Sequence, residues 1–121
     1  MRVVFYIIIC LVSISCGKQS NNVTDFRTGA FETFLEDTNV TSTAIRNDSI
    51  QIETYDGVEH IFAIKWNSNF EYELLKINPK NQLDSTPFIV KITGVKDNSY
   101  TFKAHYKGSN FKQKGRAVKT N

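Results

Sequence analysis

Few side chains in this sequence have the types and spacing that catalysis or metal binding requires. The two histidines, His60 and His105, each lack a second histidine or a cysteine at the spacing of a zinc site. Glu71 and Glu73 alternate with apolar residues, which would place both carboxylates on the solvent side of one strand, about 7 Å apart. Because solvated strands commonly carry such pairs, we expect surface residues at all four positions and no metal.

Motifs of enzymes and of cofactor sites are also missing. The sequence contains no Gly-x-Ser-x-Gly, no Gly-Lys followed by Ser or Thr, and no Gly-x-Gly-x-x-Gly. These patterns mark hydrolase nucleophiles, phosphate loops and dinucleotide sites. We therefore expect a protein that is not an enzyme and that uses no cofactor.

The N-terminus has the order of a secretory signal. Arg2 precedes an unbroken apolar run from Val3 to Val12, and small residues then lead to Cys16. As a helix, the segment from Val3 to Ile14 would reach about 18 Å, well short of the roughly 30 Å of a bilayer core. We therefore expect residues 1–15 to be a signal peptide and not a membrane-spanning anchor.

Ser15, Cys16 and Gly17 resemble the lipobox of bacterial lipoproteins, although Ser13 stands where that pattern usually has Leu. The resemblance implies that the Cys16 thiol carries acyl chains such as palmitate. Two or three chains would anchor the protein firmly, because each buried methylene contributes about 0.8 kcal/mol. One alternative stays open, an ordinary signal cleaved near Ser15. Cys10 lies inside the apolar run behind Ile9, so we assign it to the core of the signal peptide.

Residues 16–25 are mostly small and polar, which indicates a flexible tether, and residues 26–121 suffice for a single domain. Without a cysteine beyond Cys16, no disulfide framework is available. The segment after Cys16 lacks the acidic cluster that, by resemblance, directs some lipoproteins to the cell surface. We expect a monomer anchored in the cell envelope, on the periplasmic side of the outer membrane.

Positive charge is concentrated in the last third of the chain. The segment from Lys103 to Lys119 has six basic residues and no acidic residue; the basic residues are Lys103, Lys107, Lys112, Lys114, Arg116 and Lys119. Such a segment could bind an anionic partner, such as lipid headgroups or envelope polysaccharide, or a nucleic acid. Lysines on outer strands also prevent edge-to-edge association. We favour that solvated role and expect no nucleic acid for an exported protein.

From Phe26 onward, apolar and polar residues alternate with the period of half-buried strands. The apolar members of the runs are Ile50 and Ile52; Phe62, Ile64 and Trp66; Phe70, Tyr72 and Leu74; Phe88, Val90 and Ile92; and Tyr100, Phe102, Ala104 and Tyr106. Turn-forming residues such as Asp56-Gly57 and Asp97-Asn98 separate the runs. We predict an all-β fold, an antiparallel meander of seven or eight short strands in a small closed or half-closed barrel.

Five segments carry a resemblance to a family: 25–31, 46–55, Trp66 with 70–72, Asn78-Pro79-Lys80, and 112–115. They resemble small uncharacterised lipoproteins of Flavobacteria and related Bacteroidota, some of which carry the automatic label "DNA topoisomerase IV". A single small exported domain does not fit that label. The family often has cysteines where this chain has Val23 and Phe70, so the resemblance implies that apolar packing replaces a bridge here.

Two further resemblances are local. Asp48-Ser49-Ile50 and Asp84-Ser85-Thr86 resemble the O-glycosylation pattern of that bacterial group, which makes Ser49 and Ser85 candidate acceptors. Gly29-x-Phe31 at the start of the meander is similar to the opening of lipocalin-like barrels. Fold analogy does not carry function.

Three functional hypotheses follow. The first is a non-enzymatic, lipid-anchored envelope protein with a binding or structural role, whose partner is an envelope protein or polysaccharide. The second is a lipocalin-like carrier of a small apolar ligand, and the third is binding of an anionic surface or nucleic acid through the basic segment. The barrel interior discriminates the first two, since a cavity of roughly 300 Å³ or more favours a carrier. We expect a solid interior packed by Phe62, Trp66, Phe70, Phe88 and Phe102.

Overall fold

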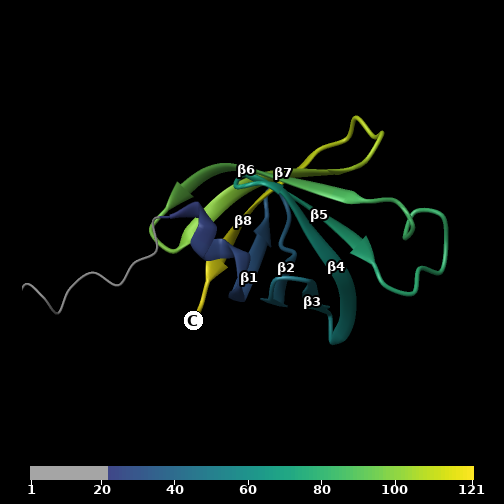
Figure 1. Ribbon diagram of the computed structural model, residues 1–121, viewed down its shortest axis with the longest axis horizontal. Coiled ribbons are helices and arrows are strands. Elements are labelled where there is room, and N and C mark those ends of the chain that lie inside the picture. Colours follow the sequence, from purple (N-terminus) through teal and green to yellow (C-terminus); the bar gives the residue numbers. More distant parts are fainter. Residues whose placement is uncertain (1–21) are drawn as a thin grey trace, which may run out of the picture.

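The computed structural model describes residues 22–121; residues 1–21, including the expected signal peptide and Cys16, lie outside the described residues. A short 3₁₀ helix, η1 (Val23–Arg27), precedes eight strands. The strands are β1 (Gly29–Leu35), β2 (Thr41–Arg46), β3 (Ile50–Tyr55), β4 (Val58–Ser68), β5 (Glu71–Lys76), β6 (Phe88–Lys96), β7 (Ser99–Tyr106) and β8 (Gln113–Lys119). The predicted all-β antiparallel meander is confirmed (Figure 1).

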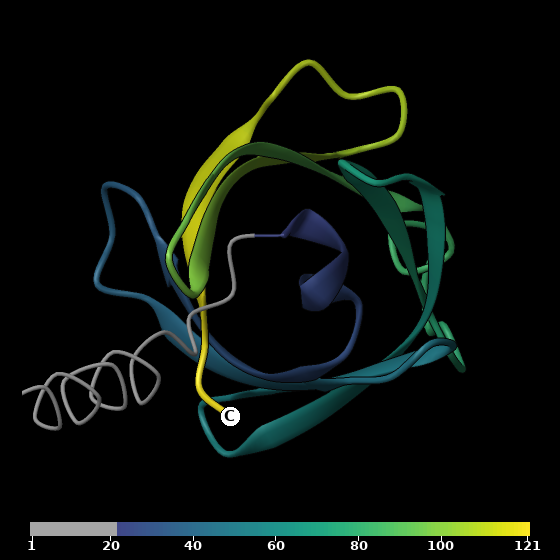
Figure 2. The same ribbon diagram turned by 60° about the vertical axis from the view of Figure 1, so that its left-hand side comes forward.

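The sheet closes on itself. Each strand pairs with the next, and β1 also pairs antiparallel with β8, with Phe31 opposite Lys119 and Leu35 opposite Gly115. The described strands therefore form a closed barrel, seen nearly end-on in Figure 2. Closure satisfies the backbone groups that an open sheet would leave at its edges. Eight strands give an interior that side chains can fill or that can hold one small ligand.

The two ends of the barrel differ. Helix η1 lies within the ring at one end, which we call the closed end (Figure 2). The long loops 77–87 and 107–112 extend from the opposite end, which we call the open end (Figure 1). Hairpin turns at the closed end are short, such as the one that joins β6 to β7 through Asp97.

Helix η1 is held in the barrel by packing and by hydrogen bonds. Phe26 is fully buried, and its ring packs edge-on against Tyr100 with centroids 5.1 Å apart. Lys119 Nζ donates to the Asp25 carbonyl at 2.8 Å, and Arg27 Nη2 donates to Asn69 Oδ1 at 3.1 Å. The tether that the sequence predicts for residues 16–25 therefore ends earlier than expected, because Val23–Asp25 belong to the helix that carries Phe26 into the core.

Most of the predicted core positions are confirmed. Ile64, Tyr72, Leu74, Val90 and Ile92 are buried, as are Tyr100, Phe102 and Ala104 on β7. Phe31 on β1 and Ala117 on β8 complete this core across the closing strand pair. The alternation in β6 and β7 thus predicts the inward face correctly.

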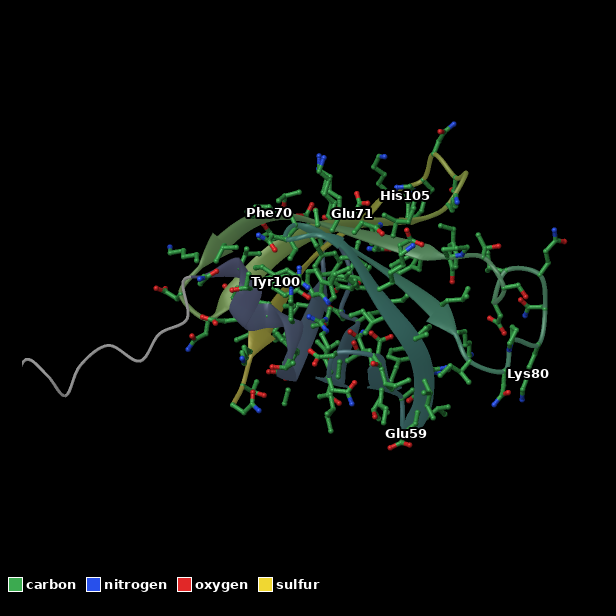
Figure 3. The ribbon with its side chains drawn as sticks, viewed as in Figure 1. Glu59, Phe70, Glu71, Lys80, Tyr100 and His105 are labelled. Carbon is green, nitrogen blue, oxygen red and sulfur yellow. The ribbon has the colours of Figure 1, made fainter. Side chains whose placement is uncertain are left out.

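The prediction is wrong for the inward face of β3 and for Phe70. Gln51 is buried and Glu53 faces the interior, whereas Ile52 faces outward opposite Ile45, which is 65% exposed on β2. The cause is the buried side chain of Arg46, which hydrogen-bonds Gln51 inside the barrel and so fixes the register of this strand pair. Phe70 lies in the turn between β4 and β5 and is half exposed, at the outer surface in Figure 3.

Gly115 is required where β8 meets β1. A Cβ atom there would lie 2.6 Å from Phe102 Cζ and 2.7 Å from the Phe34 carbonyl oxygen. Both contacts are far inside van der Waals distance, and one of them involves backbone that the β1–β8 pairing holds in place.

We predict that Gly115→Ala lowers the free energy of unfolding by about 1–3 kcal/mol, the usual cost of overpacking a core. Urea unfolding followed by tryptophan fluorescence would measure it. Gly94→Ala is the control, because its Cβ would approach only Thr101 Oγ1, at 3.1 Å. Equal stability of Gly115→Ala and the unsubstituted protein would contradict the close packing of β8 on β1.

Candidate functional site

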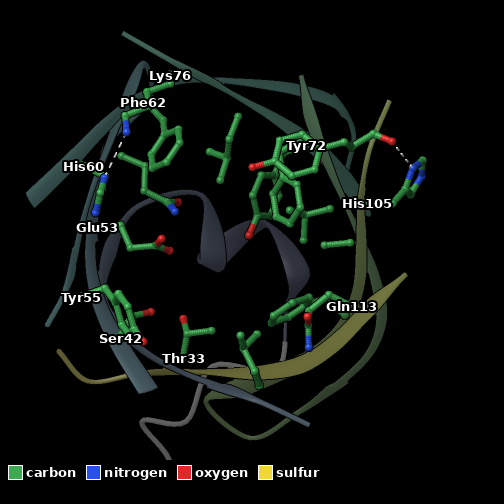
Figure 4. A pocket seen from close by; sticks show the side chains of 18 of the residues that line it. Thr33, Ser42, Glu53, Tyr55, His60, Phe62, Tyr72, Lys76, His105 and Gln113 are labelled. Carbon is green, nitrogen blue, oxygen red and sulfur yellow. Dashed lines mark hydrogen bonds between the residues drawn. The ribbon is translucent and has the colours of Figure 1, made fainter. Parts of the chain in front are cut away.

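A cavity of about 610 Å³ occupies the interior toward the open end (Figure 4). One wall, formed by β5, β6 and β7, is mainly apolar and includes Leu74, Val90, Phe88, Phe102 and Ala104. The facing wall, formed by β1, β2 and β3, is mainly polar and includes Thr33, Ser42, Arg46, Gln51 and Glu53. The cavity is therefore amphipathic from side to side.

Small inward-facing residues create this space. Thr33 and Ser42 are directly paired across β1 and β2, and Ala104 faces Gln113 across β7 and β8. None of them projects a large side chain across the barrel. The large rings that could fill the interior, Phe26, Phe31 and Tyr100, gather at the closed end instead.

The expected solid interior is therefore wrong for this half of the barrel. Phe62 and Phe88 line the cavity wall without filling its centre. Trp66 packs on Tyr72 with centroids 4.8 Å apart, and Phe70 lies outside. The sequence predicts inward aromatic residues but not their distribution between the two ends.

Arg46 is the central polar residue of the site. Its side chain is only 4% exposed, and it donates to four oxygens: Gln51 Oε1 at 2.7 Å, the Phe26 carbonyl at 2.7 Å, Tyr100 Oη at 3.0 Å and Tyr72 Oη at 3.2 Å. The two tyrosine hydroxyls are also hydrogen-bonded to each other at 2.9 Å. The guanidinium lies 4.3 Å from the ring centre of Phe31, a cation–π contact.

The surroundings keep Arg46 charged and the tyrosine neutral. Burial lowers the pKa of Arg46, but the oxygens of Tyr72 and Tyr100 favour its charged form and hold that pKa above its ordinary value. Burial raises the pKa of Tyr72 well above its ordinary value, against the opposing charge of Arg46. The site therefore presents one permanent positive charge beside neutral hydroxyl groups.

Glu53 lies on the same wall, nearer the open end, and points into the cavity in Figure 4. Burial raises the pKa of its carboxyl group, and the positive charge of Arg46 only partly offsets that effect. The carboxyl group consequently holds its proton to a higher pH than an exposed glutamate does.

Of the two histidines and two glutamates first considered for chemistry, the structure brings only Glu71 and Glu73 together. His60 is directly opposite Glu53 and lines the cavity, with its Nδ1 3.2 Å from Lys76 Nζ (Figure 4). His105 Nδ1 lies 2.9 Å from the Tyr106 carbonyl. Glu71 and Glu73 both accept hydrogen bonds from Asn67 Nδ2 and are half-buried on the outer wall. Within residues 22–121, no group of three or more His, Cys, Asp or Glu side chains could hold a metal ion.

The six basic residues of the last third do not form one surface. Lys103 and Lys114 are direct cross-strand neighbours on the outer wall, and Lys91, which the sequence did not single out, is opposite Lys103. The Arg116 guanidinium lies 5.2 Å from the ring centre of Phe34, and Lys119 is bonded to η1 at the closed end. The remaining two lysines, Lys107 and Lys112, lie on the loop at the open end.

The other sequence-predicted sites are exposed or lie outside the described residues. Ser49 and Ser85 are both exposed, in the loop before β3 and in the loop before β6. Cys16 falls in residues 1–21 and has no structural account. No helix in the described part of the chain has the length and apolar character to cross a membrane.

Arg46 is the residue that the sequence analysis missed. A signal was present, because Arg46 follows Thr41-Ser42-Thr43-Ala44-Ile45, where small and polar residues predominate over large apolar ones. Alternation of hydrophobicity does not reveal a polar residue on an inward face, so only the three-dimensional pairing identifies its partners.

We predict that Glu53→Gln raises the free energy of unfolding at about pH 8 and changes it little at about pH 4. Because the pKa of Glu53 is raised in the folded state, that state binds the proton more tightly than the unfolded state does. The free energy of unfolding of the unsubstituted protein therefore falls as the pH rises from the ordinary pKa of glutamate through the raised pKa of Glu53. Thermal unfolding across this pH range would measure the difference. Glu59→Gln at an exposed position of β4 is the control, and an equal pH-dependent gain there would contradict the role of burial.

Comparisons with known proteins do not assign this chain to a family. No protein-family model, no curated protein and no solved structure matches the chain. The case for a function therefore depends on the cavity and on the residues that line it.

Proposed function

We propose that this protein is a non-enzymatic, lipid-anchored protein of the cell envelope whose barrel binds one small amphipathic molecule. The observation that carries the binding role is the cavity of about 610 Å³. Sites for small molecules usually have volumes of about 300–1,000 Å³ and combine apolar walls with a few placed polar groups. The cavity therefore favours a carrier over a barrel that acts only as a structural unit.

The two walls of the cavity support an amphipathic ligand. The wall of β5, β6 and β7 would cover apolar surface, which contributes about 25 cal/mol for each Å² removed from water. Thr33, Ser42 and Gln51 on the facing wall offer hydroxyl and amide groups for hydrogen bonds. A ligand with one polar side or end and one apolar side or end would satisfy both.

Several polar groups at the site are already engaged in holding the barrel together, so they present fixed positions to a ligand. The Arg46 guanidinium joins η1 to β3, β5 and β7 through its hydrogen bonds. His60 is in contact with Lys76 across β4 and β5.

Anchoring at Cys16 would set the orientation of the barrel. The six residues that follow Cys16, up to and including Asn22, would span at most about 22 Å when fully extended, and Asn22 caps η1 at the closed end. The closed end would thus face the membrane that holds the anchor. The open end, with its long loops, would face away from that membrane and receive ligand from the aqueous side (Figure 1).

We predict that the neutral fluorophore N-phenylnaphthylamine binds in the cavity and that Ser42→Phe weakens this binding at least about tenfold. Ser42 faces the cavity and is half-buried, so a phenyl ring there would occupy ligand space. A tenfold loss corresponds to about 1.4 kcal/mol of binding free energy. Fluorescence titration would measure both dissociation constants.

Thr43→Phe is the matched control, because Thr43 is the next residue of β2 and is exposed on the outer wall. Its affinity for the fluorophore should equal that of the unsubstituted protein. If Ser42→Phe and Thr43→Phe bind equally, the fluorophore occupies another surface and the carrier function is refuted.

We predict that Cys16→Ser abolishes labelling by radioactive palmitate in cells and releases the protein into the soluble fraction. The thiol is the only group at that position that could carry the acyl chains, and serine cannot replace it. Cys10→Ser is the control and should remain labelled and membrane-bound. A Cys16→Ser protein that stays labelled would refute the lipid anchor while leaving the cavity unaffected.

A further inference from the structure

The positive charge of Arg46 is enclosed by neutral partners. Its four acceptors are an amide oxygen, a backbone carbonyl and two tyrosine hydroxyls, and its side chain is 4% exposed. Removing a charge from water is costly unless an opposite charge and hydrogen bonds compensate for it. The Arg46 guanidinium has the hydrogen bonds but donates none to an anionic group. An incoming ligand could supply that negative charge.

The polar cluster also has more donor hydrogens than these bonds use. Arg46 has five N–H donors, and four of them make the bonds described above, which leaves one hydrogen on Nη1. Tyr72 and Tyr100 have one hydroxyl hydrogen each, and the bond between them uses only one. One N–H and one O–H, adjacent to a positive charge, therefore have no acceptor among residues 22–121 and are left over for a ligand.

These groups meet at the inner end of the cavity. Arg46, Gln51, Tyr72 and Tyr100 all line it, and Tyr100 lies beside η1 in Figure 3. Phe102 and Val90 line the apolar wall between this cluster and the open end. A molecule that enters from the open end would reach the cluster with its leading group.

The charged groups nearer the open end do not take the place of Arg46 as the charge at the inner end of the cavity. Glu53 on β3 faces the same space and interacts electrostatically with Arg46, but none of the four hydrogen bonds of the guanidinium goes to its carboxylate. Lys76 on β5 is paired with His60 near the open end, and Asp84 lies on the loop before β6. Arg46 is thus the charge that a deeply inserted group would meet.

We propose that Arg46, with the hydroxyls of Tyr72 and Tyr100, binds the carboxylate head of a single-chain amphiphile whose tail lies along the apolar wall. This proposal rests on the carrier function proposed above. The carboxylate accepts the leftover hydrogens and neutralises the guanidinium, and charge-assisted bonds of this kind are about twice as strong as neutral ones.

The test compares two probes that differ only in the head group, dodecanoate and dodecanol. Each would displace N-phenylnaphthylamine from the unsubstituted full-length protein at neutral pH. Dodecanoate should bind at least about tenfold more tightly than dodecanol. Equal affinities would overturn the head-group assignment while leaving the carrier function intact, whereas failure of both probes and of the fluorophore would refute the carrier function itself.

Variants locate the source of the preference. Arg46→Met should reduce the preference for dodecanoate to about twofold or less, and Lys76→Met, which removes a second cavity-lining cation, should retain it. If Arg46→Met does not fold, the double variant Tyr72→Phe/Tyr100→Phe decides, because it keeps both rings and removes only the hydroxyls. That variant should lose at least about threefold of the preference, and an unchanged preference would overturn the proposal.

Discussion

The hydrogen bonds of Arg46 are the constraint on which the rest of this barrel depends. One guanidinium joins the carbonyl of Phe26 in η1 to side chains of β3, β5 and β7, so four separated segments meet at one group. Loss of one of these partners would strongly destabilise the folded state, because it would leave the buried cation with an unsatisfied donor. The helix and the strands must therefore keep their relative positions, and the closed end forms as a unit around this residue.

The same constraint reverses the predicted inward face of β3. With Arg46 inside, its cross-strand neighbour Gln51 must also be inside, and Glu53 follows two residues later. Ile45, Ile52 and Ile61 are then directly paired along the outer wall, and Ile45 and Ile61 are 65% and 41% exposed. Apolar side chains that hydrophobicity alone would bury, such as Ile52, therefore lie on the outer wall.

This reversal explains how far the sequence could predict the fold. On β6 and β7 the interior is apolar, so alternation identifies the buried face and the hairpins follow from residues such as Asp56-Gly57, both with positive φ. On β3 the interior is polar, and the identical pattern predicts the wrong face. Neither the cavity nor the partners of Arg46 could be predicted, because both depend on which residues become neighbours across strands that are far apart in the chain.

The fully buried aromatic rings pack together at the closed end, which stabilises the fold, while the cavity lies in the open half. Phe26, Phe31 and Tyr100 pack together at the closed end, with ring centroids 5.1 to 6.3 Å apart, and each buried ring there contributes to holding the fold. The open half is bounded by paired strands, by rings such as Phe62 and Phe88 that lie along the wall, and by small side chains such as Ser42 and Ala104. Because strand closure keeps that half in shape without a packed centre, the interior there can vary to suit a ligand while the closed end maintains the barrel.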